Sequence, residues 1–211
     1  MTDKKINWDQ FYLPNVPLYR CKLPQEIIDR LWDYVKKAKT SLNKGLAGNI
    51  SESLSLVDED NFFMKNVIFP VCQKYGNCGI KIVNSQVDAD FRSLKLSDFW
   101  VNYQNQTEFN PLHNHSGVVS FVIWLKIPTD FTEQHNLPFV KHSNTPAASD
   151  FQFVYSDMLG RIQESRVAMN EDMEGVIVVF PSGLNHQVYP FYNCDEQRIS
   201  ISGNVLIEAK L

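Results

Sequence analysis

The feature that most constrains this fold is a change of sequence pattern near Gly79. Before it, two stretches repeat apolar residues at helical spacing; after it, short segments alternate apolar and polar residues between turn residues. Helices followed by many short strands are typical of a β-sandwich or closed jelly roll with helices on its outside. We therefore predict a mainly β (α+β) fold. The predicted strands are 81–86, 99–104, 118–128, 151–155, 166–169, 175–180, 186–189 and 198–208.

The N-terminal third is predicted to support this β core. Residues 1–23 contain prolines and aromatics, which indicates an extended arm or a first strand. Pro24 is expected to open a helix that runs to about Lys39, because Pro is favoured in a first helical turn. The Ser-, Asn- and Gly-rich stretch 40–57 is predicted to be a loop.

A second helix is predicted from Asp58 or Glu59 to Tyr75, and Pro70 should kink or interrupt it. The length of 211 residues suits one domain with a full core. We therefore expect a single domain over 1–211, with the arm and helices in 1–78 and the β core in 79–211. The β core contains a polar, weakly patterned insertion, 129–150, which is long enough to be a lid over a site.

Composition excludes some classes of function. The formal net charge is −4, and 20 Lys and Arg residues are scattered among 24 acidic ones. The chain therefore shows no basic stripe of the kind that binds phosphate backbones, which disfavours nucleic acid as a partner. No secretory signal or apolar run long enough to span a bilayer is found, so we expect a cytoplasmic protein without a membrane partner. The four cysteines lack a metal or disulfide spacing and are expected to be reduced.

Two histidines two positions apart, His113 and His115, form the first candidate for chemistry. Residues two apart on an extended strand point to the same side, so both imidazoles can converge on one metal ion. A bare pair of this kind is also common as two surface histidines in a loop. His186 follows the apolar strand 176–180 and a turn, which places it at the exit of a buried strand. Alone, such a residue is more often a hydrogen-bonded core histidine than a ligand.

Arg198-Ile199-Ser200 is the third element, on the last predicted strand. Arg198 and Ser200 share one face of this strand, and the isoleucines share the other. If the polar face points inward, the planar guanidinium can bind a carboxylate through two parallel bonds, with the Ser200 hydroxyl alongside. If it points outward, the isoleucines form the core and Arg198 is solvated. The alternation alone does not decide between these two orientations.

The order of these elements resembles the 2-oxoglutarate/Fe(II) oxygenase superfamily, whose pattern is HxD/E…H…R-x-S. The resemblance is greatest to small phage and bacterial members of its prolyl-4-hydroxylase-like branch, and it covers roughly residues 95–207. The segments that carry it are Phe99-Trp100-Val101-Asn102-Tyr103, Pro111-Leu112-His113-Asn114-His115-Ser116-Gly117, Gly175 to Ser182, His186, and Arg198 to Asn204.

The resemblance implies a double-stranded β-helix (a jelly roll, cupin-like) with the N-terminal helices on the outer sheet. It also implies an oxygenase that uses Fe(II), 2-oxoglutarate and O2 to hydroxylate a substrate. His113 and His186 would be metal ligands. Trp100 and Trp124 are expected either to line the active-site cavity or to be simple core residues.

The resemblance further assigns residues to the cosubstrate. Arg198 would pair with the distal carboxylate of 2-oxoglutarate, helped by Ser200. Tyr103 or Asn102, on the strand that leads to the first histidine, would add a hydrogen bond.

The chain departs from the family pattern at His115, where Asp or Glu is usual. His115 can be a third ligand, it can orient a water that takes the position, or Glu108 or Asp98 can supply the carboxylate. We favour His115 as the ligand, because its spacing fits and no nearby carboxylate is better placed.

Two other functions stay open from the sequence. A cupin-type dioxygenase could use the three histidines without 2-oxoglutarate, and a non-catalytic jelly-roll module could carry them by chance. The substrate is not encoded in any motif; a peptide or a small molecule is favoured. The exposed edges of a jelly roll often pair, so a homodimer is possible.

Overall fold

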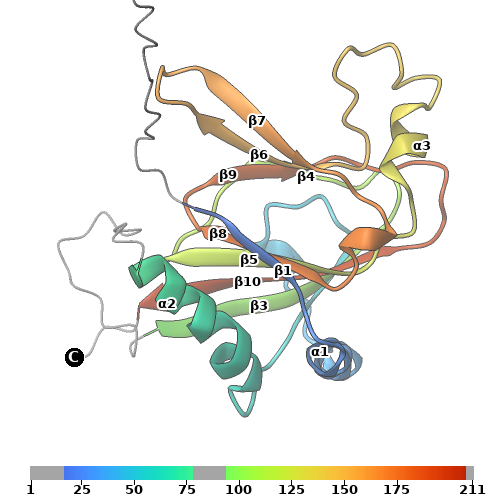
Figure 1. The fold of residues 1–211 in the computed structure, drawn as a ribbon. Helices are drawn as coiled ribbons and strands as arrows, with labels where there is room; N and C mark the ends of the chain where they lie inside the picture. The colour runs from blue at the N-terminus through green and yellow to red at the C-terminus, as the bar shows by residue number, and fades with distance from the viewer. Residues whose placement is uncertain (1–16, 78–93, 208–211) are drawn as a thin grey trace, which may run out of the picture.

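The computed structural model describes residues 17–77 and 94–207, which form two antiparallel sheets and a layer of helices (Figure 1). The larger sheet has the strand order β1-β8-β5-β10-β3-β2, and the smaller has the order β4-β9-β6-β7. The strands of the larger sheet are β1 (Tyr19–Lys22), β8 (Val176–Pro181), β5 (Val119–Lys126), β10 (Arg198–Ile207), β3 (Leu94–Gln104) and β2 (Glu52–Ser55). Those of the smaller sheet are β4 (Asn110–His113), β9 (Asn185–Val188), β6 (Phe151–Ser156) and β7 (Ile162–Val167).

The two N-terminal helical segments lie on the face of the larger sheet that points away from the smaller one (Figure 1). Helix α1 (Gln25–Lys37) begins directly after Pro24, close to the predicted start, and buries Ile27, Leu31 and Val35. These residues recur at four-residue spacing, so they form one apolar stripe that packs on the sheet.

The second helical segment changes its regular pattern close to Pro70, where an interruption was predicted, and the interruption is a π-helical turn. It begins near Phe62, and the Asp58 carboxylate accepts the N–H groups of Phe63 and Met64 at 3.0 and 2.9 Å. A π-helical turn (Met64–Ile68) then leads directly into α2 (Phe69–Asn77). Pro70 therefore lies where the hydrogen-bond pattern changes from π to α, and the helix continues beyond it.

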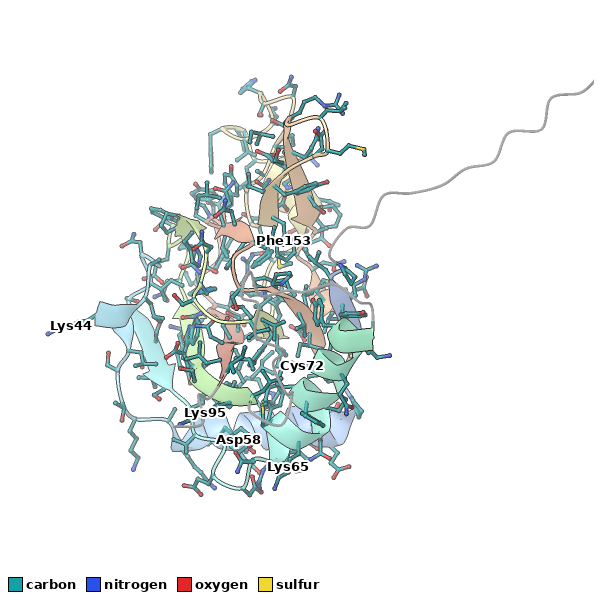
Figure 2. All side chains as sticks on the ribbon, turned by 90° about the vertical axis from the view of Figure 1, so that its left-hand side faces the viewer. Lys44, Asp58, Lys65, Cys72, Lys95 and Phe153 are labelled. Atoms are coloured by element: carbon teal, nitrogen blue, oxygen red, sulfur yellow. The ribbon has the colours of Figure 1, made fainter. Side chains whose placement is uncertain are left out.

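The core has two layers, because the strands of the larger sheet are apolar on both faces. The layer beneath the helices contains Phe63, Cys72, Phe99 and Ile123. The layer between the sheets is built from strand residues that include Trp124, Phe153 and Phe180. Cys72 and Phe153 mark the two layers in Figure 2. This arrangement of two facing sheets with helices outside is the predicted double-stranded β-helix.

The predicted strands are found with shifted ends, except for 81–86, which lies outside the described residues. The segment 99–104 is part of a longer strand that begins at Leu94. In place of the predicted segment 166–169, the structure has β7 at Ile162–Val167. It is an exposed edge strand, and its polar residues do not show the alternation that predicts a strand. Elements at sheet edges bury one face at most, so their sequences carry a weaker apolar alternation.

The prediction of a loop over 40–57 is wrong in part. Its last residues form β2, which pairs antiparallel with β3 at the sheet edge, Ser53 opposite Asn102. A short 3-10 turn (Asn43–Gly45) precedes it, and the Asn43 side chain accepts the Ser53 N–H at 2.8 Å. The Ser-rich composition indicated a loop because hydroxyl side chains replace apolar ones on this strand.

The insertion 129–150 contains one short helix, α3 (Phe131–His135), which Asp130 caps by accepting the Thr132 N–H at 2.7 Å. Gln134 on α3 is buried and binds both backbone groups of Tyr192. These bonds attach the insertion to the segment between β9 and β10. No helix within the described ranges is long and apolar enough to cross a membrane.

Candidate metal and cosubstrate site

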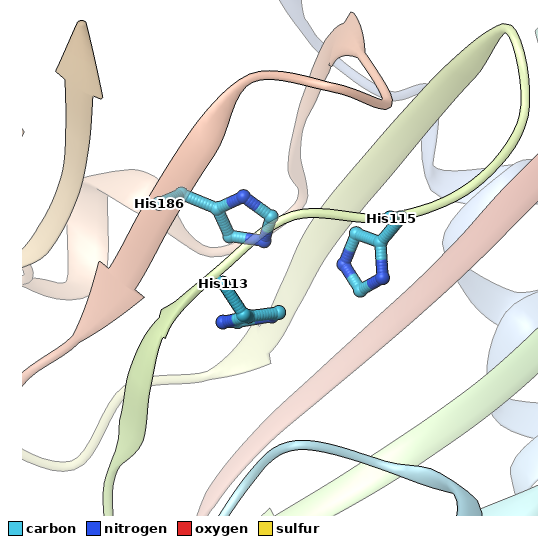
Figure 3. A group of neighbouring side chains, drawn as sticks. All are labelled: His113, His115 and His186. Atoms are coloured by element: carbon cyan, nitrogen blue, oxygen red, sulfur yellow. The ribbon is translucent and has the colours of Figure 1, made fainter.

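Three histidines converge at the end of the smaller sheet (Figure 3). His113 ends β4 and lies opposite His186 of β9 in the strand register, and His115 follows β4 by two residues. One nitrogen from each ring lies within 4.8 Å of the other two. Strand pairing thus brings together two side chains that are 73 positions apart in the chain, and the loop after β4 adds the third.

Backbone contacts fix the orientation of these rings. Nδ1 of His113 lies 2.7 Å from the Pro111 carbonyl oxygen, and Nδ1 of His186 lies 2.9 Å from that of Leu184. A carbonyl oxygen only accepts hydrogen bonds, so Nδ1 carries the proton in each ring and Nε2 keeps its lone pair. Each of the two histidines therefore offers Nε2 as a donor atom to a metal ion.

The site favours neutral imidazoles. Burial lowers the pKa of His186 to about 3, against an opposing effect of the hydrogen bond to the Leu184 carbonyl. Burial also lowers the pKa of His115 to about 4, and the proximity of His113 adds to this effect. Both rings are therefore unprotonated at neutral pH, which is the form that ligates metals.

Neither carboxylate considered from the sequence reaches this group. Glu108 accepts the backbone N–H groups of Ser51 and Asn105, at 2.9 and 2.8 Å, and so belongs to a turn. Asp98 is exposed and accepts the Asn204 side-chain amide at 3.1 Å. Within 17–77 and 94–207, the group of potential metal ligands consists of histidines alone.

Arg198 is the main charged residue of the same cavity. It is buried to 1% exposure, and its Nη2 donates to the hydroxyl of Ser149. Among the described residues its Nε and Nη1 have no hydrogen-bond partner, and its guanidinium lies 5.1 Å from the centre of the Phe191 ring. Burial lowers the pKa of Arg198 to about 10, against an opposing effect of Asp150. The guanidinium is therefore charged at neutral pH and has donors free for an anion.

One cavity joins the histidines to Arg198. Among the described residues that line it, Arg198 is the single Arg, Lys, Asp or Glu side chain. The polar face of β10 points into it, which settles the orientation that the alternation left open. The lining from the central strands includes Trp100, Asn102, Trp124, Phe180, Arg198, Ser200 and Ser202.

Asn102 and Tyr103, which were alternative candidates for a hydrogen bond to the cosubstrate, lie on opposite faces of β3. Asn102 lines the cavity, is buried, and accepts the Ser53 hydroxyl at 2.7 Å. Tyr103 packs against the helix-side layer, on the other face of the sheet. Neighbouring residues of a strand point to opposite faces, so only one of the two can reach the cosubstrate. Tyr103 is not placed to do so.

Ser149 contacts Arg198 from the last turn of the insertion and was not predicted from the sequence. A serine in a polar stretch carries no pattern that marks it as buried. The only signal was its place directly before the apolar strand β6.

The residues present fit a metal ion and a dicarboxylate cosubstrate. Three imidazole rings whose ligand nitrogens lie within 4.8 Å of one another suit a divalent transition metal. The buried guanidinium with unpaired N–H groups suits a carboxylate, because an unpaired buried donor is costly unless an anion satisfies it.

The family comparison agrees with this chemistry. The model of the family described as "Putative 2OG-Fe(II) oxygenase" matches residues 98–204, just over half of the chain. The chain therefore belongs to the 2OG-Fe(II) oxygenases, enzymes that depend on Fe(II) and 2-oxoglutarate. The cupin-type and non-catalytic alternatives are not favoured. No curated protein matches the sequence.

A solved structure of this class shares the fold. An oxidoreductase of the 2OG-Fe(II) oxygenase family from Burkholderia pseudomallei is similar with a TM-score of 0.53 and 12% identity, covering 90% of this chain and 84% of that one. A prolyl-4-hydroxylase from Pseudomonas putida matches with a TM-score of 0.47 and 16% identity, covering 92% of this chain and 93% of that one.

Proposed function

We propose that the protein is a hydroxylase in which His113, His115 and His186 hold Fe(II) and Arg198 anchors 2-oxoglutarate. The observation that carries this proposal is the common cavity: a buried guanidinium with unpaired N–H groups opens into the same space as three convergent imidazoles. Either feature alone would also suit a purely structural role. Together they match a metal ion and a carboxylate of one small cosubstrate.

Iron and 2-oxoglutarate, when bound, supply the oxidising chemistry, in which O2 converts 2-oxoglutarate to succinate and CO2 and gives one oxygen atom to the substrate. The protein's part is to orient and to shield. The backbone carbonyls of Pro111 and Leu184 fix two imidazoles with Nε2 free. The buried side chains of Trp100 and Trp124 limit the access of water to the cavity.

The cosubstrate end is built on β10 and β3. Arg198 offers an N–H edge of its guanidinium, whose Nε and Nη1 have no partner among the described residues, to the distal carboxylate, and the Ser200 side chain lines the cavity two residues along the same face. Asn102 faces them from β3, where it lies opposite Ser200 in the strand register. We assign Arg198 the anchoring role, with Ser200 and Asn102 as neutral hydrogen-bonding groups beside it.

His115 in place of a carboxylate changes the charge balance. With a neutral third ligand, the loaded site carries one more positive charge than a site with two histidines and a carboxylate. This favours binding of the 2-oxoglutarate dianion but lowers the affinity for Fe(II) itself, because an anionic ligand attracts the cation more strongly.

The substrate assignment follows the lining of the cavity. Its walls are apolar and neutral polar apart from Arg198 and the histidines, which favours an uncharged group at the reacting position. The expected substrate is a peptide or a small molecule. The cytoplasmic location and the homodimer stay predictions.

The proposal is tested by succinate formation and by ligand binding in matched variants. We expect the wild type with Fe(II) to release succinate from 2-oxoglutarate slowly without a substrate. His186→Ala should lose Fe(II) binding, whereas Arg198→Met should bind Fe(II) normally and lose 2-oxoglutarate. An Arg198→Met protein that binds 2-oxoglutarate as tightly as the wild type would refute the anchoring role.

A further inference from the structure

Ser149 is a buried serine with an unusual backbone conformation. It has no exposed surface, and its φ is +74°, in the left-handed region that residues other than Gly adopt at an energetic cost. It ends the insertion 129–150 together with Asp150, directly before β6. A strained residue that persists in a buried position is one that its surroundings hold in place.

Three backbone hydrogen bonds hold this conformation. The Ser149 N–H donates to the Pro190 carbonyl at 2.8 Å, and the Asp150 N–H donates to that of Ala147 at 3.0 Å. The Asp150 carbonyl in turn accepts the Tyr189 N–H at 2.9 Å. The end of the insertion is thus tied to the segment that follows β9, and the position of the Ser149 hydroxyl is fixed.

The Ser149 hydroxyl makes two contacts. It accepts a hydrogen bond from Nη2 of Arg198, and it lies 3.3 Å from the hydroxyl of Thr129. Since Ser149 accepts from the guanidinium, its own proton is free to go to Thr129. Thr129 and Ser149 stand at the two ends of the insertion, so both ends of this segment meet beside Arg198.

We propose that Ser149 is a positioning residue for the cosubstrate: it holds Nη2 of Arg198 so that an N–H edge of the guanidinium stays directed to the distal carboxylate of 2-oxoglutarate. This inference rests on the proposed function, because it requires Arg198 to be the anchor. It also gives the insertion a role, since the segment delivers the hydroxyl that orients the anchor.

A merely structural serine would behave differently from a positioning one. Replacement by Ala removes the hydroxyl and keeps the strained φ, whereas replacement by Gly removes the hydroxyl and relieves the strain. Ser149→Gly should therefore be more stable than Ser149→Ala. If the hydroxyl orients Arg198, the affinity for 2-oxoglutarate should fall in both variants, because both lack the hydroxyl. If Ser149 acts only through its backbone conformation, Ser149→Gly should bind 2-oxoglutarate with wild-type affinity.

The experiment measures the dissociation constants of Fe(II) and then of 2-oxoglutarate under anaerobic conditions, with the unfolding midpoint of each variant. The control is Ser143→Ala, an exposed serine of the same insertion whose hydroxyl contacts only neighbouring residues of its own turn. We expect both Ser149 variants to bind 2-oxoglutarate about tenfold more weakly, with unchanged Fe(II) affinity. Ser143→Ala should match the wild type.

Two results would overturn the inference. The first is wild-type affinity for 2-oxoglutarate in both Ser149 variants. The second is a reduced affinity in Ser149→Ala together with wild-type affinity in Ser149→Gly. Arg198→Met, measured in parallel, separates this failure from failure of the proposed function. If Arg198→Met loses 2-oxoglutarate while the Ser149 variants keep it, only the positioning role is wrong. If Arg198→Met also keeps it, the anchor itself is wrong.

Discussion

Replacing Arg198 by Met should make the metal-free protein more stable, although it removes the residue that we assign to 2-oxoglutarate. Met is close to Arg in length and fills irregular space without polar atoms. The change therefore removes a buried charge while leaving little cavity. Residues that serve binding commonly reduce the stability of the free protein, and Arg198 shows the physical origin of such a cost.

The size of the effect follows from the surroundings of the guanidinium. Its Nε and Nη1 are buried without a partner among the described residues, and each unpaired donor costs about 1–3 kcal/mol. Burial lowers the pKa of Arg198 from 12.5 to about 10, which corresponds to roughly 3 kcal/mol against the charged form. Because the pKa is lowered for a base, this penalty is fully present at pH 7 and is relieved only above about pH 10.

Losses offset part of this gain. The hydrogen bond to Ser149 and the contact with the Phe191 ring disappear, together about 2–3 kcal/mol. The pKa shift and the unpaired donors express the same burial cost, and two unpaired donors at about 2 kcal/mol each exceed these losses. We therefore expect a net increase of about 1–2 kcal/mol in the free energy of unfolding, or a rise of roughly 2–8 °C in the melting temperature.

Thermal and guanidinium unfolding at pH 7, with chelator to remove metals, measures this difference. Arg166→Met is the control, because Arg166 is partly exposed and donates to the Pro146 carbonyl at 2.5 Å, so its loss should not stabilise the protein. Adding Fe(II) and 2-oxoglutarate anaerobically should reverse the order, since only the wild type gains stability from the cosubstrate. An Arg198→Met protein less stable than the metal-free wild type would refute the reasoning.

Three other variants test separate parts of the structure. His115→Asp should tighten Fe(II) binding at least about tenfold by adding an anionic ligand, and an unchanged dissociation constant would place His115 outside the metal's ligands. His186→Ala should weaken Fe(II) binding about 100-fold or more, measured by calorimetry, and wild-type affinity would contradict the ligand set. Gly203→Ala should lower the unfolding free energy by about 1–3 kcal/mol, since an added Cβ would lie 2.7 Å from the Asp98 carbonyl oxygen and 2.6 Å from the Phe121 ring; chemical unfolding equal to wild type would contradict this.

The convergence of the three histidines was predictable from the sequence because strand pairing preserves order and register. The pair His113 and His115 and the later His186 are recognisable in the chain, and the pairing of β4 with β9 brings them together. The orientation of Arg198 was not predictable, because both faces of β10 are largely buried. In a central strand of a layered fold, alternation separates the two faces without saying which one faces the site.

The features that the sequence did not predict are those positioned by main-chain hydrogen bonds, because such bonds leave no pattern of apolar residues in the sequence. Ser149 is placed by three main-chain hydrogen bonds around it, and no local sequence pattern encodes them. Strand β2 is stabilised by pairing with β3 at a sheet edge, and its serines indicated a loop. Tyr103 and Asn102 differ only in which face they take, which depends on the register of the whole sheet.

The central claim is that one cavity binds Fe(II) through three histidines and 2-oxoglutarate through Arg198. The most direct test is an anaerobic titration of the metal-free protein with Fe(II) and then 2-oxoglutarate, monitored in the visible range. We predict a weak charge-transfer band that requires both ligands, is absent in Arg198→Met, and is bleached by O2 with release of succinate. Iron binding without the band, or a band of full strength in Arg198→Met, would contradict the claim.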